Sequence, residues 1–483
     1  MNVLKKIICC AYIILIPALS IAQKPVTANI ILSDTSLFSA NTSAKVCIKN
    51  LTVTGTKKTR IYIVYREIHF KKGDSLLITD LQKELEQARF QVYNTTLFNE
   101  VKFEMVALDA YNVSITVQVI ERWYFYPTPQ FQLVDRNFNE WYKTHKASLD
   151  RVNYGLKFVH YNLSGRRDQL RIYLINGYTR NFSFSYNNPY SNSSLNEGFN
   201  IGAGYSQNRE IPYKTDSANK TLFYKKPDFT RNTLYATAGY IIRRGLFTKH
   251  NFTISYTHQK VDDSVITKIY NPNYYNGPVT SKHVVDINYV LQYANVNNGS
   301  YPLTGKSAFI TIQKRGLGFT GGINMLTLEA GLNKYFNIGK TWYSSIQLNG
   351  KIKLPFNQAY INQSGLGYGE NYLRGLEYYV IDGVATALVK STLKKKIIAF
   401  NVPFPYFPKL LTKIPFTIFA KTYADVGYAY NKKTTYTYLN NRVLYSGGFG
   451  IDILTLYDIN LRFEYSFNQL KENGLFLHNQ SGF

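Results

Sequence analysis

The sequence has few cysteines and, beyond its first residues, no long apolar run. Three of its 483 residues are Cys, and two of them, Cys9 and Cys10, lie in the apolar stretch near the N-terminus. Removal of that stretch would leave Cys47 alone, so we expect no intramolecular disulfide. No later segment approaches the roughly 18 consecutive apolar residues of a membrane-spanning helix. A helical membrane protein is therefore excluded.

Sequence patterns typical of enzymes are also missing. No Gly-x-Ser-x-Gly motif occurs, and around Ser364 the two glycine positions hold Asn362 and Leu366. The seven His residues are scattered without metal-ligand spacing. The glycine-rich stretch 316–322 lacks the Gly-Lys-Ser/Thr of a phosphate-binding loop. We expect no enzyme activity, metal or cofactor, although a Ser–His pair on neighbouring strands is not visible in a single sequence.

The first 22 residues have the features of a secretory signal peptide. Lys5 and Lys6 form a basic start, Ile7 to Leu19 are apolar, and Ser20-Ile21-Ala22 fits a small-x-small cleavage site. A short buried or anchoring helix is the alternative. We therefore expect the protein to be exported. Residues 23–44, which follow the signal peptide, are interpreted as a polar lead-in.

Tyr and Phe are what the sequence has in abundance. It contains 42 Tyr and 30 Phe, and its mean hydropathy is slightly polar at −0.22. Soluble cores use aliphatic residues freely and need fewer hydroxylated rings. So many amphipathic rings suit a surface that is partly apolar and partly wet.

Residues 45–121 have the pattern of a small α+β domain. Strands are predicted over 46–53, 101–105 and 113–119, and a short helix over 59–68. Apolar residues then recur at helical spacing from Leu81 to Val92. A capping box of Thr79 and Gln82 is expected to begin that second helix.

Residues 122–483 alternate between apolar and polar residues instead. Clear cases are 182–187, 199–206, 285–293 and 457–468, and this period indicates β-sheet. A soluble β-sandwich also alternates. However, tight turns such as Leu163-Ser164-Gly165 and long polar stretches such as 213–231 and 261–282 favour a membrane barrel.

We therefore expect a transmembrane antiparallel β-barrel of about 16 strands, preceded by the small α+β domain. Fourteen or eighteen strands fit the length almost as well. The Tyr and Phe residues would form the lipid-facing band and the interfacial girdles. The cluster Lys394-Lys395-Lys396 is interpreted as a turn, solvated or facing lipid phosphates.

One late segment carries a family resemblance. Residues 367–376 read Gly-Tyr-Gly-Glu-Asn-Tyr-Leu-Arg-Gly-Leu and resemble the Val-Arg-Gly-Phe/Tyr loop signature of the outer-membrane protein assembly-factor superfamily, also called bacterial surface antigen. The segments 301–305, 381–383 and 424–427 match further motifs, and the chain ends in Phe, as many such barrels do. The motif's aromatic residue is Leu376 here.

The small domain resembles a polypeptide-transport-associated (POTRA) domain. The resemblance rests on the glycine turns at Gly55 and Gly73 and on Phe98 and Val101 before the last strands. The principal assembly factor normally has several POTRA domains, and this chain has room for one. The sequence from Glu121 onward is similar to that of single-POTRA members from Bacteroidetes-type bacteria.

The resemblance implies roles for several barrel residues. Arg374, with Gly375, is expected to tether the loop to the inner barrel wall, because an Arg fork bonds carboxylates and carbonyls together. Asp425 and Gly427 are possible wall partners. The Glu-x-Arg that is usual on the strand following the loop reads Leu388-Val389-Lys390 here, so Lys390 is a less certain partner.

The resemblance also implies a weak lateral seam between the first and last strands, here about 123–133 and 474–483. Its expected residues are Gly474, Leu475, Leu477 and Phe483. Weakness is predicted because alternation in the last segment is poor, although that segment can also be a short capping strand. An incoming chain would pair with the exposed edge.

The implied function is insertion, assembly or translocation of proteins at the bacterial outer membrane, with the POTRA domain in the periplasm. Expected partners are outer-membrane lipids, nascent outer-membrane or exported proteins, and periplasmic or lipoprotein accessory subunits. The alternative is a passive pore or surface-structural barrel. Nucleic acid is not an expected partner despite the net charge of +26, because the chain carries an export signal and its basic residues are spread among loops.

Overall fold

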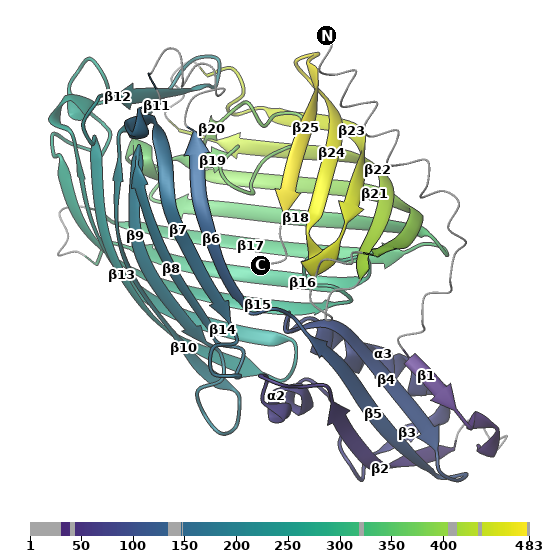
Figure 1. Ribbon diagram of the computed structural model, residues 1–483. Helices are drawn as coiled ribbons and strands as arrows, with labels where there is room; N and C mark the ends of the chain where they lie inside the picture. Colours follow the sequence, from purple (N-terminus) through teal and green to yellow (C-terminus); the bar gives the residue numbers. More distant parts are fainter. Residues whose placement is uncertain are drawn as a thin grey trace.

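The computed structural model describes residues 30–38, 44–133, 146, 148–317, 323–403, 413–432 and 437–480. The signal peptide and Phe483 lie outside these residues. Two main sheets organise the described chain, and Figure 1 shows the smaller one below the larger. No helix among the described residues is long and apolar enough to span a membrane.

The N-terminal unit is an α+β domain with a five-stranded sheet in the described chain, in the order β1-β4-β5-β2-β3. Its elements are β1 (Ile30–Ser33), β2 (Lys45–Thr54), α2 (Ile61–Arg66), β3 (Ser75–Leu77), α3 (Leu81–Tyr93), β4 (Phe98–Ala107) and β5 (Asn112–Glu121). Strands β4 and β5 alternate strictly between buried and less buried residues, because their inner face packs on the helices. The arrangement fits a single POTRA domain.

Three details of this unit differ from the sequence-based expectation. Part of the expected polar lead-in forms β1, which pairs in parallel with β4. The expected cap on the second helix is wrong, because Thr79 lies in the 3-10 turn Ile78–Asp80 and no side chain caps α3. The chain also adds the short strand β3 beside β2, which the apolar pattern did not indicate.

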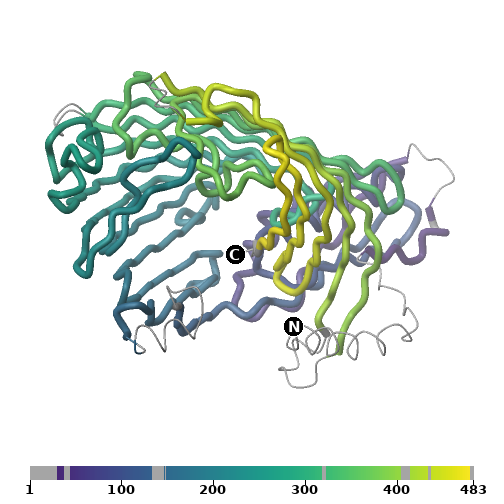
Figure 2. Tube along the Cα trace, turned by 90° about the horizontal axis from the view of Figure 1, so that it is seen from above, coloured from purple at the N-terminus to yellow at the C-terminus, as the bar shows by residue number. Residues whose placement is uncertain are grey.

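The second unit is a 16-stranded antiparallel sheet in the described chain, in which each strand pairs with the next member along the sequence. Figure 2 shows this sheet curled into a barrel. Its strands are β6 (Phe125–Leu133), β7 (Val152–Tyr161), β8 (Gln169–Gly177), β9 (Thr179–Asn188), β10 (Glu197–Asn208), β13 (Arg231–Arg244), β14 (Thr248–Val261), β15 (Ser281–Val296), β16 (Gly305–Arg315), β17 (Met325–Asn337), β18 (Trp342–Leu354), β21 (Ala385–Pro403), β22 (Lys413–Tyr430), β23 (Val443–Leu454), β24 (Asn460–Asn468) and β25 (Asn473–Gln480).

The outward residues of these strands are apolar and exposed, which is the arrangement of a barrel that faces lipid. They recur at every second position, as in Phe182 and Phe184 of β9 and in Ile310 and Ile312 of β16. The expected strand over 457–468 is shorter, because Tyr457 and Asp458 form a turn with positive φ values. The Lys394–Lys396 cluster lies within β21 rather than in a turn.

The two ends of the barrel differ as the sequence predicted. Short turns such as 162–168 and 245–247 meet the small domain, whereas long connections occupy the opposite end. Two of these long connections fold into small hairpins of their own. They are β11 (Glu210–Thr215) with β12 (Thr221–Lys225), and β19 (Ser364–Leu366) with β20 (Ile381–Asp382).

Candidate functional site

The connection between β18 and β21, residues 355–384, folds back against the inner wall of the barrel. It buries Leu366, Leu373 and Leu376 together with Leu388 of β21 and Leu444 of β23. Leu376 is 1% exposed, so the residue that replaces the motif's aromatic ring serves as an apolar anchor. Burial of these leucines holds the loop against the wall through the hydrophobic effect.

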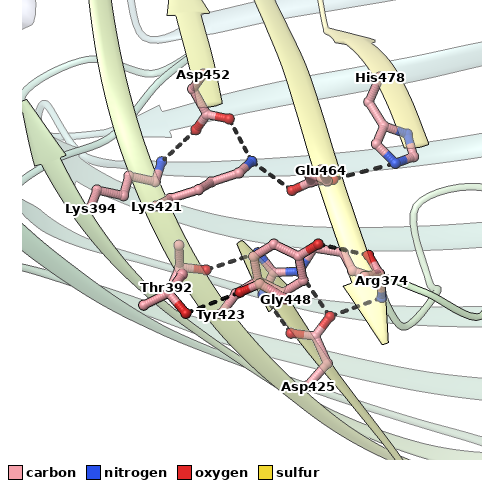
Figure 3. A network of polar contacts seen from close by, with 12 residues as sticks. Arg374, Thr392, Lys394, Lys421, Tyr423, Asp425, Gly448, Asp452, Glu464 and His478 are labelled. Atoms are coloured by element: carbon pink, nitrogen blue, oxygen red, sulfur yellow. Dashed lines mark hydrogen bonds and ion pairs between the residues drawn. The ribbon is translucent and has the colours of Figure 1, made fainter. Parts of the chain in front are cut away.

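Arg374 joins this loop to the wall, as the sequence predicted. Its guanidinium donates to both carboxylate oxygens of Asp425 on β22, at 2.9 and 2.5 Å, and its backbone N–H donates to the same carboxylate at 3.0 Å. The guanidinium also donates to Thr392 Oγ1 at 3.0 Å and lies 4.0 Å from the Tyr423 ring centre. Figure 3 shows this group. A fork with this many partners fixes the loop's position and orientation.

Two glycines allow this close packing. Gly375 has φ +94°, and a Cβ there would lie 2.8 Å from the Ser466 Cβ on β24. A Cβ on Gly427 of β22 would lie 2.7 Å from Leu373 Cδ1. Gly427 therefore contributes space for the loop rather than a polar contact.

Lys390 lies beside the tether without bonding to Asp425. The two residues are opposite each other in the β21–β22 register. The Lys390 ammonium instead lies 4.2 Å from the ring centre of Tyr372, which is on the loop. Lys390 thus contacts the loop through a cation–π interaction.

A second buried charge network lies above the tether in Figure 3, and the sequence analysis missed it. Lys421 of β22 contacts Asp452 of β23 and Glu464 of β24, each at 2.5 Å. Lys394 of β21 lies 3.7 Å from Asp452, and His478 of β25 lies 3.4 Å from Glu464. The network links the last five strands of the barrel through residues far apart in sequence.

The loop also reaches the last two strands. Asn468 of β24 donates to the Gly375 carbonyl at 2.8 Å. His478 of β25 stacks on Tyr372 and lies 3.5 Å from Glu377. The tethered loop therefore supports the inner side of the sheet's C-terminal edge.

The small domain is joined to the barrel base by a buried ion pair. Glu67, at the end of α2, accepts from the Arg243 guanidinium of β13 at 2.5 and 2.6 Å and from Tyr190 Oη at 2.7 Å. Burial alone would raise the pKa of Glu67, but the charge and hydrogen bonds of Arg243 outweigh it and hold that pKa below its ordinary value. Glu67 is 1% exposed.

A second joint connects the domain to the C-terminal part of the barrel. Arg122, just before β6, pairs with Asp458 in the β23–β24 turn at 2.8 Å, and both side chains are buried. Tyr93 of α3 and Asn298 of the β15–β16 turn each donate to Asp458 at 2.9 Å. The Asp458 carboxylate thus connects the small domain, the linker before β6 and two barrel turns through its contacts.

The expected seam lies between β6 and β25. Within the described residues, no strand pairs with the outer edge of either one, and both views show the two strands apart. Leu475 and Leu477 are 61% and 66% exposed, while Phe476 is buried. Leu475, Phe476 and Leu477 are three consecutive apolar residues, so the sequence alternation is poor here as expected. Strand β25 nevertheless pairs with β24 along its whole length, including Gly474.

The four POTRA motif residues lie in the small domain as structural positions. Phe98 and Val101 belong to its buried core. Gly55 has φ +90°, and a Cβ there would lie 2.0 Å from the Val119 carbonyl oxygen. Gly73 lies in the turn before β3, and its N–H donates to the Ile48 carbonyl of β2 at 2.8 Å. Gly55 in particular has no room for a side chain.

No group of three or more His, Cys, Asp or Glu residues in the described chain is placed to hold a metal ion. No protein-family model matches the sequence, and neither does any curated protein. Similarity appears at the level of structure. CdiB from Escherichia coli matches with a TM-score of 0.52 at 12% identity, covering 90% of this chain and 75% of that one.

Two further structures have lower scores. BamA from Haemophilus ducreyi lacking POTRA domains 1–3 matches with a TM-score of 0.49 at 14% identity, over 90% of this chain and 84% of that one. CdiB from Acinetobacter baumannii gives 0.45 at 11% identity, over 91% and 74%. The likeness to Escherichia coli CdiB shows a shared fold, a transmembrane β-barrel preceded by POTRA-like structure.

Proposed function

We propose that the protein inserts, assembles or translocates other proteins at the bacterial outer membrane, with its small domain in the periplasm. The observation that carries this proposal is that, among the described residues, the outer edges of β6 and β25 pair with no other strand of the barrel sheet. Unpaired backbone groups are costly in lipid, so a barrel that only encloses a pore gains nothing from them. A barrel that pairs with client strands needs such an edge.

The tethered loop supports the same proposal. Arg374 and its neighbours hold residues 355–384 against the inner wall and against β24 and β25. The resemblance of this segment to the assembly-factor loop signature then gains a physical role, because the loop braces the edge that clients would use. The joints at Glu67 and Asp458 would hold the small domain close to this edge.

The sequence features favour a specialised single-POTRA member, of the kind found in Bacteroidetes-type bacteria, over the principal assembly factor. Clients would be nascent outer-membrane or exported proteins, with lipids of the outer membrane around the barrel. Accessory periplasmic or lipoprotein subunits would bind the small domain. The competing function is a passive pore or surface-structural barrel.

Depletion of the protein followed by quantitative proteomics of the outer membrane separates these functions. The proposal predicts that a defined set of other outer-membrane proteins falls in abundance and recovers when the wild-type chain is restored. Restoration with Arg374→Ala should recover them poorly, whereas Arg442→Ala, which changes an exposed arginine, should recover them fully. Unchanged levels of every other outer-membrane protein would contradict the proposal.

A further inference from the structure

The two edges of the seam differ in their backbone hydrogen-bonding groups. The Tyr161 N–H donates to the Tyr124 carbonyl at 2.7 Å, which makes these two residues a hydrogen-bonded pair at the start of β6. The β6–β7 register continues from there without interruption. In an antiparallel pair, residues that bond to the partner alternate with residues that face away. Even-numbered residues of β6 therefore face β7, and odd-numbered residues face the open edge.

Two of those odd-numbered residues are Pro127 and Pro129. Proline has no backbone N–H, so the middle of the open β6 edge lacks two consecutive donors on that side. Side chains also occupy edge acceptors. The Trp123 indole N–H donates to the Phe125 carbonyl, and the Gln130 amide donates to the Pro129 carbonyl at 3.2 Å. The β6 edge is therefore a poor template for another strand.

The β25 edge has its full set of donors. The Asn468 N–H donates to the Glu472 carbonyl at 3.1 Å, and the β24–β25 register continues from that pair. By the same alternation, residues 473, 475, 477 and 479 direct their N–H and C=O groups away from β24. None of them is a proline. Among all the residues that the structure describes, no strand pairs with the side of β25 that faces away from β24.

Side chains add a second requirement at β25. Leu475 and Leu477 point outward and are exposed, while Phe476 points inward and is buried. A strand added here would continue the barrel wall, so it needs apolar residues on the lipid side at the same period. Transmembrane strands of outer-membrane proteins have this pattern.

We propose that β25 is the edge onto which a client's transmembrane strand is added, and that β6 is blocked against pairing by Pro127 and Pro129. This inference rests on the proposed function and gives it a direction. A client strand on β25 finds a donor for each of its acceptors. On β6 two of its carbonyls would stay unmatched inside the membrane, where no water replaces the missing bonds.

Site-specific photocrosslinking of the full-length protein in its own outer membrane tests this direction. A photocrosslinking amino acid replaces Leu477 of β25 or Phe131 of β6, which are 66% and 63% exposed. The control position is Leu332 in the middle of the wall, on β17, 49% exposed. We expect adducts at Leu477 that map to a strand of another outer-membrane protein, severalfold above both Phe131 and Leu332.

The outcomes separate this inference from the proposed function. Client adducts at Phe131 that equal or exceed those at Leu477 would overturn the direction and leave the proposed function intact. Adducts at Leu477 only with β6 of the same chain, or only with a second copy, would also overturn the inference. Client adducts at neither edge, together with an unchanged proteome after depletion, would overturn both.

Adding a proline to β25 and removing the two prolines from β6 should exchange the behaviour of the two edges. Leu475→Pro removes an edge donor from β25 without touching a bond to β24, so it should abolish client adducts at Leu477. Pro127→Leu with Pro129→Leu restores the β6 donors and should create adducts at Phe131. Heat-dependent migration on detergent gels shows whether each variant keeps its barrel. A folded Leu475→Pro variant with unchanged adducts at Leu477 would refute the role of the β25 edge.

Discussion

Two buried arginines attach separate parts of the chain to the barrel, and they do so in different settings. Arg374 holds a loop against the inner wall, 51 residues from its partner Asp425. Arg243 holds the small domain against the barrel base, 176 residues from its partner Glu67. Each guanidinium contacts both oxygens of a carboxylate that is almost completely buried.

The difference lies in what surrounds each pair. The Arg374 site is packed between strands and backed by the Tyr423 ring and a leucine cluster. The Glu67 site lies between the small domain and the barrel, where α2 meets β13. We infer that the first site supports the barrel itself, whereas the second controls where the domain lies and responds to solvent conditions.

The largest effect is expected from Arg374→Ala. This change leaves the Asp425 carboxylate buried without its cation, which typically costs about 3–5 kcal/mol. The barrel should then unfold at a lower temperature, measured as loss of its heat-modifiable band on detergent gels. Arg442→Ala, at an exposed arginine over the Tyr438 ring, should not change that temperature. Equal unfolding temperatures for both variants would remove the tether from the account.

Glu67→Gln should loosen the domain at its contact with β13, while the barrel stays folded and the joint at Asp458 still holds the other side of the domain. Loss of the charge weakens hydrogen bonds worth roughly 1.5–3 kcal/mol when one partner is ionised. Spin-label distances between the domain and the barrel base should broaden. Glu86→Gln is the matched control, because Glu86 is half exposed and lies 3.4 Å from Arg89, and such surface pairs contribute little. If the two variants give the same narrow distances, the joint does not fix the domain.

The joint between Glu67 and Arg243 should respond to acid. Because the pKa of Glu67 is depressed in the folded protein, its stabilising effect is complete above the ordinary carboxyl pKa of 4.5 and is lost as the pH falls through the depressed value. Domain-to-barrel distances should be constant from neutral pH to about pH 5 and broaden only at lower pH. Glu67→Gln should remove this dependence. Broadening already at pH 6 would indicate a different titrating group.

The smallest effect is expected from Gly427→Ala. The new Cβ would contact the flexible end of Leu373, so we expect a cost of about 1 kcal/mol from overpacking. The control is Gly350→Ala on β18, where the nearest atom lies at 3.9 Å. Both variants are compared by unfolding temperature. A loop that tolerates Gly427→Ala as well as Gly350→Ala would show that its packing on the wall is loose.

Sequence patterns predicted the parts of the molecule that depend on short-range periodicity or on a contiguous motif. The sheet and the small domain follow from such patterns, whereas the contact between Arg374 and Asp425 was implied by the family resemblance of the loop segment. The joint of Glu67 with Arg243 and the network around Lys421 were missed, because their members are far apart in sequence. Alternation placed Glu464 on the polar face of its strand without indicating which residues of other strands lie beside it.

The seam illustrates a signal that was present and overlooked. The family resemblance implied a seam between the first and last strands, and its expected weakness was attributed to poor alternation in the last strand. The alternating prolines at 127 and 129 are the visible cue, since proline within a strand marks an edge. Lys394 is a similar case, because a run of three lysines suggested a turn and the register places it in β21, near Asp452.

Reconstitution in liposomes measures whether the protein itself accelerates the folding of a client. The purified full-length protein is placed in liposomes, and a urea-unfolded outer-membrane protein that fell upon depletion is added. The account predicts that the folded, heat-modifiable form of this client appears faster with the wild-type protein than with empty liposomes, and that Leu475→Pro removes the acceleration. Equal folding rates with and without the wild-type protein would contradict the account.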